Sequence, residues 1–478
     1  MRNGLLVTRQ FSMADQQAFA HASGDCNPMH MDEVAARRTQ AGAPVVHGVH
    51  TVLWALDRLA AAGEPLDRLA TLKVQFSKFV YLGREIALTV ARRNDDGMKF
   101  ALVDDGLTVS TLTLKFGARD RAETARFEDM PVVTLGDAPL APEFDAMRAM
   151  SGRLVPPLEA CELVKNFPHL ASILGEHRII GLALLSTLVG MVCPGQHSMF
   201  SGFSIQMMDA DKSPNLAWRT ERADERFRMV WLRVAGLGIA GEVSSWVRAE
   251  PVVPPDMTTL SKLVTPGEFA GRTGLIVGGS RGLGAVTAKL LAAGGARIIV
   301  TYATGKEEAE ALVAKIRAAR GDAAATSLVF DVRSEAGRQF PSVPDITHLY
   351  YFATPRISRQ PTAVFDLSVF EEFTRFYIDG FHALARWLVH NRKSLRCIFY
   401  PSSVFVTSHP SGMTEYAMVK AAAEILCADL MAATGLSIAV PRIPRVLTDQ
   451  TATVPPVETQ DPVAVMLPLL RAENHAPS

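Results

Sequence analysis

A glycine-rich turn at residues 278–284, Gly-Gly-Ser-Arg-Gly-Leu-Gly, constrains the fold of this chain more than any other feature. The apolar residues 273–277 before it predict a buried strand, and residues 285–291 after it predict a helix. Glycines let the backbone turn tightly, and a helix N-terminus offers unpaired N–H groups to an anion. Glycines alone would mark only a tight turn, but this context is the one that a dinucleotide fingerprint requires. The candidate phosphate-binding residues are Gly278, Ser280, Arg281, Gly282 and Gly284.

The overall composition limits the classes of protein that this chain can belong to. A length of 478 residues predicts two to four domains, and shares of 48% apolar and 21% charged residues are typical of a soluble globular protein. Lys plus Arg and Asp plus Glu both total 49, so no global field favours nucleic acid or a membrane surface as a partner. The five cysteines have no metal-ligand spacing and indicate free thiols and no metal site. Because the N-terminus has no secretory pattern, we expect a cytoplasmic location.

Hydrophobic patterning divides the chain into three globular parts and two linkers. Residues 1–118 and residues 151–250 each predict helix followed by strands. Residues 271–478 alternate strand and helix, which predicts a parallel, doubly wound α/β sheet. Residues 119–150 and residues 251–270 are rich in proline or lack periodicity, and we interpret them as linkers.

The first part carries two polar loops around an apolar helix. Residues 13–22 predict a helix that leads into a loop with Asp25 and His30, where Gly24 and the Asn-Pro pair at residues 27–28 should break regular structure. We therefore expect Asp25 and His30 on a turn rather than in a regular element. A second loop ends at Gly48, where the next helix should begin with unpaired backbone N–H groups. Strands are expected at residues 69–76, 85–90, 100–103 and 109–116.

This part resembles the α+β hotdog fold of the MaoC-like (R)-specific enoyl-CoA hydratases and dehydratases. The resemblance rests on Ser23-Gly24-Asp25, Asn27-Pro28, His30, Asp32 and Val46-His47-Gly48. It implies that Asp25 and His30 share a water molecule, either one acting as base, and that the Gly48 N–H stabilises an enolate oxygen. The alternative is that Asp25 caps a helix and His30 is a satisfied buried histidine.

The next part repeats the arrangement of the first without its polar pair. Residues 180–195 echo residues 48–63, with glycine, apolar helix and glycine at similar spacing, and four strand candidates follow within residues 199–247. The apolar stretch at residues 179–193 is interrupted by Ser186 and Thr187 and is shorter than the roughly 20 residues of a membrane span, so we expect a buried helix. We predict a second, degenerate hotdog that packs on the first as a double hotdog and forms half of a substrate channel.

The last part carries Ser403, Tyr416 and Lys420. Tyr416 and Lys420 are four residues apart, so they project from one face of a helix, and the ammonium lowers the cost of forming phenolate. Tyr416 can then exchange a proton with a substrate oxygen that Ser403 also binds. With the glycine turn, this set resembles a short-chain dehydrogenase/reductase with a Rossmann-type sheet. The resemblance implies cofactor contacts at Asp331, Ala353, Lys420, Pro444 and Thr448.

The expected cofactor is NADP(H) rather than NAD(H). No acid follows the strand at residues 296–302, where an NAD site usually carries one, while Arg281 and Lys306 could meet a 2′-phosphate. The alternative is that Arg281 is merely solvated. Three features depart from the family and bear on rate and substrate. They are Tyr377 at an asparagine position, Phe352-Ala353-Thr354 in place of Asn-Ala-Gly, and only 34 residues after Pro444, residues 445–478.

Together the two resemblances predict a bifunctional enzyme acting on acyl thioesters of CoA or acyl carrier protein. The reductase would interconvert 3-oxoacyl and 3-hydroxyacyl forms, and the hotdog would interconvert 3-hydroxyacyl and 2-enoyl forms. The product of one reaction is the substrate of the other. Two alternatives are a reductase that acts on a non-thioester carbonyl, and a module that is only a degenerate binding scaffold. Both families commonly self-associate, so we expect a homo-oligomer.

Overall fold

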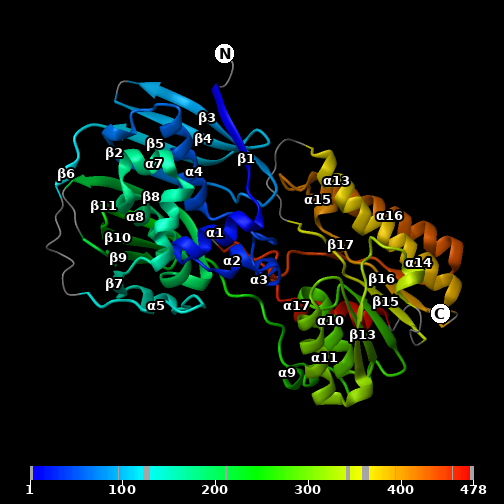
Figure 1. Cartoon of the computed structure of the whole chain (residues 1–478). Helices are drawn as coiled ribbons and strands as arrows, with labels where there is room; N and C mark the ends of the chain where they lie inside the picture. Colours follow the sequence, from blue (N-terminus) through cyan, green and yellow to red (C-terminus); the bar gives the residue numbers. More distant parts are fainter. Residues whose placement is uncertain are drawn as a thin grey trace. The chain divides into compact units, whose positions relative to one another are not determined.

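The structure is a computed structural model that describes residues 4–94, 96–121, 130–209, 213–340, 345–357, 365–392, 394–454 and 456–473. It forms two compact units, residues 1–250 with 453–457 and residues 251–452 with 458–478 (Figure 1). Among the described residues no single helix is long and apolar enough to cross a membrane. The bent pair Pro168–Leu174 and Glu176–Val192, with 115° between its helices, passes that test of length and composition only as a pair.

The first unit contains two copies of one pattern, a long helix followed by a meander of strands. The first copy comprises β1 (Gly4–Gln10), α1 (Met13–Ser23), α2 (Pro28–Met31), α3 (Glu33–Arg37), α4 (Gly48–Ala61), β2 (Leu69–Phe76), β3 (Glu85–Asn94), β4 (Gly97–Asp104) and β5 (Leu107–Phe116). The second comprises β7 (Ser151–Leu154), α6 (Glu162–Asn166), α7 (Pro168–Leu174), α8 (Glu176–Thr187), a π-helical turn (Leu188–Val192), β8 (Ser198–Asp209), β9 (Leu216–Asp224), β10 (Met229–Gly236) and β11 (Ile239–Val247). The strands predicted in both copies are present.

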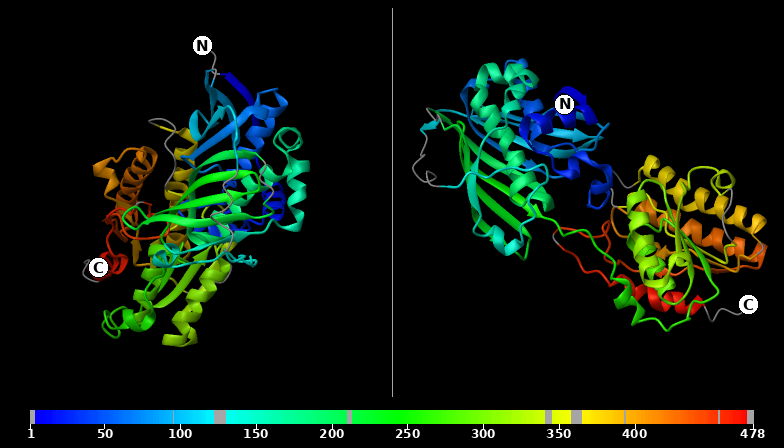
Figure 2. Two further views of the ribbon diagram at one scale, coloured as in Figure 1. Left: turned by 90° about the vertical axis from the view of Figure 1, so that its left-hand side faces the viewer. Right: turned by 60° about the horizontal axis from the view of Figure 1, so that its bottom comes forward.

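All ten of these strands belong to one antiparallel sheet with the order β1-β3-β4-β5-β2-β8-β11-β10-β9-β7. Read from either edge, each copy places its strands in the order first, third, fourth, fifth, second. The copies join where β2 pairs with β8, from Thr71 opposite Gln206 to Gln75 opposite Gly202. Figure 2 shows strands β8, β9, β10 and β11 of the second copy side by side in green. The two copies thus repeat one strand order within one hotdog-like antiparallel sheet.

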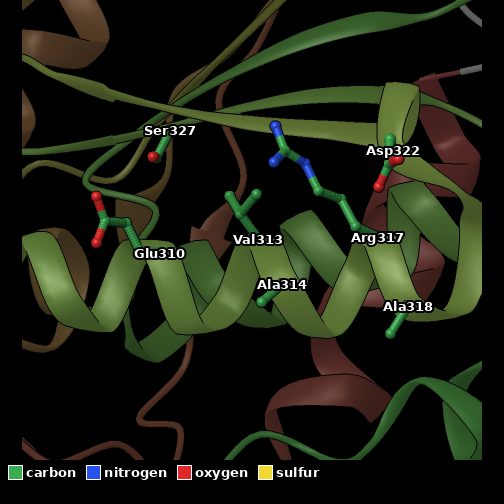
Figure 3. A pocket seen from close by; sticks show the side chains of 7 residues that line it. All are labelled: Glu310, Val313, Ala314, Arg317, Ala318, Asp322 and Ser327. Atoms are coloured by element: carbon green, nitrogen blue, oxygen red, sulfur yellow. The ribbon is translucent and has the colours of Figure 1, made fainter.

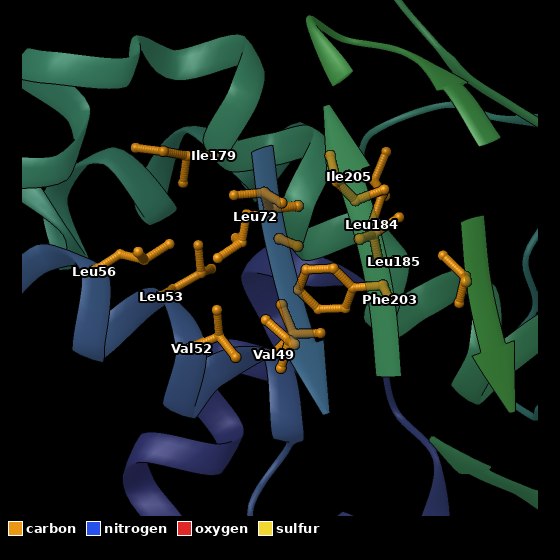
Figure 4. Close-up of a cluster of buried hydrophobic side chains, with 14 of the residues drawn as sticks. Val49, Val52, Leu53, Leu56, Leu72, Ile179, Leu184, Leu185, Phe203 and Ile205 are labelled. Atoms are coloured by element: carbon orange, nitrogen blue, oxygen red, sulfur yellow. The ribbon is translucent and has the colours of Figure 1, made fainter. Parts of the chain in front are cut away.

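The two long helices, α4 and α8, pack on the joined strands and share one hydrophobic core. Figure 4 shows side chains of both helices around β2 and β8, among them Val52, Leu53, Leu56, Leu72, Leu184, Leu185, Phe203 and Ile205. Burying one such side chain contributes about 1.5–3 kcal/mol. Because both copies contribute to this single core, each depends on the other for burial. The prediction of a buried helix at residues 179–193 is correct, since every residue from Ile179 to Thr187 in α8 is buried.

The segment predicted as the first linker contains short elements. Within residues 119–150 the structure has β6 (Asp120–Arg121), which pairs with β8, and α5 (Phe144–Met147). Residues 122–129 lie outside the described part of the chain. The second predicted linker contains α9 (Met257–Ser261), and the ammonium of Lys289 donates to the carbonyls of Pro254 and Pro255, at 3.0 and 2.7 Å.

The second unit is built on a six-stranded parallel sheet with the order β14-β13-β12-β15-β16-β18. Its strands are β12 (Thr273–Val277), β13 (Arg297–Tyr302), β14 (Ala325–Val329), β15 (His348–Tyr351), β16 (Cys397–Phe399) and β18 (Ser437–Ala439), and β17 (Ser402–Ser403) pairs separately with β19 (Arg442–Ile443). The order corresponds to 3-2-1-4-5-6, so the winding direction reverses between β12 and β15. A crevice for a ligand forms at the carboxyl ends of strands where such a reversal occurs. The predicted Rossmann-type fold is therefore confirmed.

Helices cover both faces of this sheet. They are α10 (Gly282–Ala293), α11 (Lys306–Arg320) and α17 (Pro462–Ala472) on one face, and α12 (Ala336–Gln339), α14 (Gly380–Asn391) and α16 (Thr414–Thr434) on the other. Successive strand residues alternate between the two cores, Ile276 with the first group and Leu275 with the second. The helix predicted at residues 370–390 consists of α13 (Leu367–Thr374), a π-helical turn (Arg375–Asp379) and α14. In the described residues, no strand after β18 extends this sheet, and the last described helix is α17.

Candidate active sites

The loop after α1 is shaped by caps that place Asp25 and His30. Gly24 ends α1 in the left-handed conformation, with φ of +81°. Asn27 caps α2 by accepting from the backbone N–H of Met29, and Pro28 occupies the first helical position. Asp25 lies in the loop as expected, but the prediction of a turn for His30 is wrong. His30 lies in α2 because the Asn-Pro pair starts a helical turn instead of only breaking one.

The carboxylate of Asp25 is 1% exposed and held from two sides. Its Oδ1 accepts from the backbone N–H of Asn27 at 3.2 Å, and its Oδ2 accepts from the hydroxyl of Ser186 at 2.6 Å. Burial raises the pKa of this carboxyl, and the nearby His30 and the Ser186 hydrogen bond oppose that rise. A carboxyl whose pKa is raised in this way can exchange a proton closer to neutral pH. The cap of α2 is Asn27, so Asp25 is not a capping residue here.

Two histidines lie beside Asp25. The Nδ1 of His30 donates to the carbonyl of Val45 at 2.8 Å, which leaves the Nε2 lone pair of the neutral ring for other partners. The Nε2 of His47 donates to the backbone carbonyl of Asp25 at 3.0 Å. Burial, with the nearby His30, lowers the pKa of His47 well below its usual value, so this ring is neutral.

Asp25, His30 and His47 present possible ligand atoms within 4.8 Å of one another. The His30 and His47 rings are stacked, with centroids 4.0 Å apart and planes 29° apart. Because the Nε2 of His47 carries the proton that it donates to the Asp25 carbonyl, this atom is not a metal ligand in that tautomer.

Gly48 begins α4 next to these groups. The residue before it, His47, makes no capping hydrogen bond with its side chain, so the first N–H groups of α4 have no side-chain cap. A Cβ at position 48 would lie 2.9 Å from the Phe76 ring, which only glycine avoids. The start of α4 is thus packed closely against Phe76, and its uncapped N–H groups have the chemistry of an oxyanion donor.

The second hotdog supplies part of this site, which the sequence reasoning missed. Besides Ser186, the hydroxyl of Thr187 donates to the Ser23 carbonyl at 2.6 Å, and the Asn27 amide donates to the Gly190 carbonyl at 2.7 Å. A Cβ at Gly190 would lie 2.3 Å from Asp25 Oδ1. The signal was present in the sequence, because two polar residues inside a buried apolar helix need hydrogen-bond partners.

The glycine turn of the second unit is closely packed against the end of β15. Gly278 has φ of +72°, and a Cβ there would lie 2.8 Å from the Ala353 N. A Cβ at Gly284 would lie 2.4 Å from the Gly278 carbonyl oxygen. Helix α10 begins after Arg281 without a side-chain cap, so its N–H groups can receive a pyrophosphate. Ser280 is half-buried in this turn, and Thr448 lies beside Gly282. The cradle fits the predicted dinucleotide.

Three charged cofactor candidates already have partners, and one of them, Lys306, lies 3.8 Å from Glu310 Oε1 through its Nζ. Arg281 Nη1 lies 3.8 Å from Asp449 Oδ2. Asp331 accepts from Arg333 in a bidentate pair, at 3.0 and 2.7 Å, which lowers the pKa of the carboxyl. A phosphate at Arg281 would have to replace or share the contact with Asp449.

The structure brings Ser403, Tyr416 and Lys420 together at the carboxyl end of the sheet. Ser403 lies on β17, and Tyr416 and Lys420 lie on α16. Burial raises the pKa of Tyr416 to about 12, opposed by a hydrogen bond with Ser403, and burial lowers the pKa of Lys420 to about 7. The Lys420 ammonium donates to the Pro401 carbonyl at 2.7 Å. This is a phenol with a hydroxyl and an ionisable amine beside it, which is suited to proton transfer.

A surface hollow of about 550 Å³ lies on α11 and β14 (Figure 3). It is lined by Glu310, Val313, Ala314, Arg317, Ala318, Asp322 and Ser327. None of these is a candidate site residue. The hollow therefore shares no lining residue with either candidate site.

Comparison with known proteins finds two families in the chain. Residues 4–128 match the family described as MaoC like domain, and residues 272–340 match the family described as short chain dehydrogenase. A curated relative, the short chain dehydrogenase/reductase nsrJ of Aspergillus novofumigatus, is 44% identical over 61 residues, which are 13% of this chain and 23% of the relative. The match therefore spans less than a quarter of that relative.

Similar solved structures include a short chain dehydrogenase of Burkholderia cenocepacia in complex with NADP. It is 22% identical, with a TM-score of 0.37, over 42% of this chain and 90% of that chain. A blue fluorescent protein from a metagenomic library in complex with NADPH is 22% identical, with a TM-score of 0.35, over 39% of this chain and 78% of that chain.

Proposed function

The chain joins a MaoC-like dehydratase domain to a short-chain dehydrogenase/reductase domain, and from this premise we propose that it is a bifunctional enzyme acting on acyl thioesters. The reductase interconverts 3-oxoacyl and 3-hydroxyacyl groups with NADP(H). The hotdog unit interconverts 3-hydroxyacyl and 2-enoyl groups. One observation carries the proposal more than any other: a buried carboxylate and a histidine with a usable lone pair lie together beside the uncapped start of α4.

In hydration, Asp25 and His30 hold one water molecule between the Asp25 carboxylate and the Nε2 of His30. One of the pair takes a proton as the water oxygen adds to C3 of the enoyl group, and the pair returns that proton to C2. The Gly48 N–H receives the negative charge that develops on the thioester oxygen. Such acid–base assistance accelerates a reaction roughly 10²–10⁴-fold.

In reduction, Tyr416 donates its proton to the 3-oxo oxygen, and Ser403 binds the same oxygen. A bound nicotinamide cofactor supplies the hydride that arrives at C3. The charge of Lys420 lowers the cost of the phenolate left on Tyr416. The preference for NADP(H) is supported by the absence of an acid at the end of β13 and by the cations Arg281 and Lys306 nearby in sequence.

Two single variants test whether the sites are independent. Asp25→Asn should lower crotonyl-CoA hydration by about 10²–10⁴-fold while NADPH oxidation with acetoacetyl-CoA persists. Tyr416→Phe should produce the reverse pattern. Each variant thus acts as the folding control for the other. Equal loss of both activities in both variants would contradict two separate sites.

A substrate panel separates thioester reduction from reduction of another carbonyl. Purified chain is incubated with NADPH and 3-oxoacyl-CoA, with a sugar lactone and with a simple ketone, and the products are separated. The proposal expects turnover of the 3-oxoacyl thioester and, after longer incubation, appearance of the 2-enoyl thioester. Turnover of only the non-thioester carbonyls would contradict it for the reductase.

A further inference from the structure

We propose that Tyr377 and Tyr400 are positioning residues of the reductase site that hold the ammonium of Lys420 against their ring faces. The inference rests on the proposed reductase function and concerns what stabilises the ammonium form of this buried lysine. It assigns a role to Tyr377, one of the three departures from the family.

Lys420 is surrounded by aromatic rings. Its Nζ lies 4.0 Å from the ring centroid of Tyr377, 4.7 Å from that of Tyr400 and 5.8 Å from that of Tyr416. The side chain is 4% exposed, and the ammonium donates to the Pro401 carbonyl at 2.7 Å. An ammonium has three N–H donors, and the π faces of the tyrosines lie where further acceptors would be expected.

Two titratable side chains near Lys420, Glu424 and Cys427, must also be considered as partners of the ammonium. Glu424, one turn further along α16, accepts from Arg442 at 2.8 and 2.7 Å and also from Ser402. Cys427, on the same helix, has its pKa raised to about 12 by burial and is a neutral thiol. The nearest carboxylate is therefore already paired with a guanidinium. The charge of Glu424 still favours the ammonium, and the rings add to it on the side of Tyr377 and Tyr400.

Hydrogen bonds fix the two rings in place. The Tyr377 hydroxyl hydrogen-bonds with the Thr354 hydroxyl at the end of the β15 strand. The Tyr400 hydroxyl donates to the Tyr377 carbonyl at 3.0 Å. Tyr377 lies in the π-helical turn Arg375–Asp379, where the widened backbone departs from regular helical hydrogen bonding. Neither tyrosine can rotate away from Lys420 without losing its hydrogen bond, which is partly buried for Tyr377 and buried for Tyr400.

Two of the family departures are thus one feature. Thr354 stands at the last position of the family's Asn-Ala-Gly and Tyr377 at a family asparagine position, and in the structure their hydroxyls contact each other. Tyr377 also packs edge-on against Tyr416, with centroids 5.7 Å apart. The threonine orients the tyrosine, and the tyrosine contacts both Lys420 and the proton donor. The pair is therefore a modified support for the site rather than a sign of a degenerate one.

The test measures the protonation of Lys420 without any substrate. Full-length chain is labelled competitively with acetic anhydride across a pH series, and labelling of Lys420 is followed by peptide mass spectrometry. A cation–π contact stabilises only the ammonium, so Tyr377→Leu should move the midpoint of labelling to lower pH by about one unit. Tyr377→Phe keeps the ring face and should leave the midpoint within about 0.3 unit of wild type.

Phe373→Leu is the matched packing control. Phe373 is also buried and contacts Tyr377 and Tyr416 by ring packing, with centroid distances of 5.9 Å in both cases. This variant should not move the midpoint. Equal midpoints in wild type and Tyr377→Leu, or an equal shift in Phe373→Leu, would overturn the inference. Because the readout needs no carbonyl substrate, failure of the proposed thioester reduction would show separately, in the substrate panel.

Discussion

At the scale of single residues, the hydratase site depends on a serine from the other hotdog. Ser186 is the donor closest to the Asp25 carboxylate, at 2.6 Å, and the whole contact is buried. A hydrogen bond to a charged group contributes about 1.5–3 kcal/mol, because it favours the ionised form. Burial raises the pKa of Asp25, and Ser186, together with His30, opposes that rise.

We expect Ser186→Ala to shift the acidic limb of the pH profile of hydration to higher pH. The pKa of Asp25 is already raised by burial, and loss of the donor that lowers it raises it further. The carboxylate then needs a higher pH to ionise, by about 1–2 units. The measurement is kcat/KM for crotonyl-CoA against pH. Ser186→Thr should restore the limb, because it keeps a hydroxyl.

Thr187→Val is the matched control for that variant. It removes the neighbouring hydroxyl, which donates to the Ser23 carbonyl and makes no hydrogen bond to the Asp25 carboxylate. The free energy of unfolding should fall, while the acidic limb of kcat/KM against pH should stay at the same pH. A limb that moves equally in Ser186→Ala and Thr187→Val would show that helix packing, not the hydrogen bond, sets the profile.

The sequence identified some of these residues and not others for a physical reason. Asp25, His30 and Gly48 lie close together in the chain within a local motif, so their spacing was readable, although their catalytic roles remain predictions. Ser186 contacts Asp25 from 161 residues away, and no local pattern encodes which buried carboxylate a helical serine will meet. Burial only required that Ser186 have some partner.

At the scale of elements, both candidate sites lie next to a π-helical turn. Leu188–Val192 brings Gly190 against Asp25, and Arg375–Asp379 brings Tyr377 against Lys420. Such turns are common at functional sites. The apolar pattern predicted both helices but not the turns, because hydrophobic periodicity does not resolve one inserted residue. Local sequence patterns also could not predict the pairing of β2 with β8, because these two strands lie far apart in the chain.

A hydrogen-bonded contact also joins helix α4 of the first hotdog to helix α7 of the second. Asp57, 1% exposed on α4, accepts from the backbone N–H groups of His169 and Leu170 at 2.9 and 3.0 Å. These are the second and third residues of α7, whose own N-cap residue provides no side-chain bond. Asp57 thus caps a helix that lies more than 100 residues further along the chain.

We expect Asp57→Ala to destabilise the double hotdog by about 2–3 kcal/mol, since it leaves two helix N–H groups uncapped. The urea midpoint for loss of crotonyl-CoA hydration measures this change. Asp57→Asn keeps a carbonyl acceptor of the same shape and should lower the free energy of unfolding by about 1 kcal/mol or less. Equal midpoints for the alanine and asparagine variants would contradict a capping role.

At the scale of the whole molecule, the chain presents an apolar face on α16. Met418 is 46% exposed and Ile425 is 67% exposed, and the two are seven residues apart, so they lie on one side of the helix. Exposed apolar residues grouped on one face commonly mark an interface. We therefore propose that the expected homo-oligomer forms through α16.

Ile425→Glu tests this assembly, because a carboxylate buried between two copies would be strongly unfavourable. Sedimentation of the wild-type chain at micromolar concentration should give a multiple of 51.8 kDa, and the variant should give a smaller species. Val253→Glu is the matched control, since Val253 is 73% exposed and lies outside α16. It should leave the mass unchanged. A wild-type chain that sediments as a monomer, or a Val253→Glu variant that dissociates equally, would rule out an interface on this face.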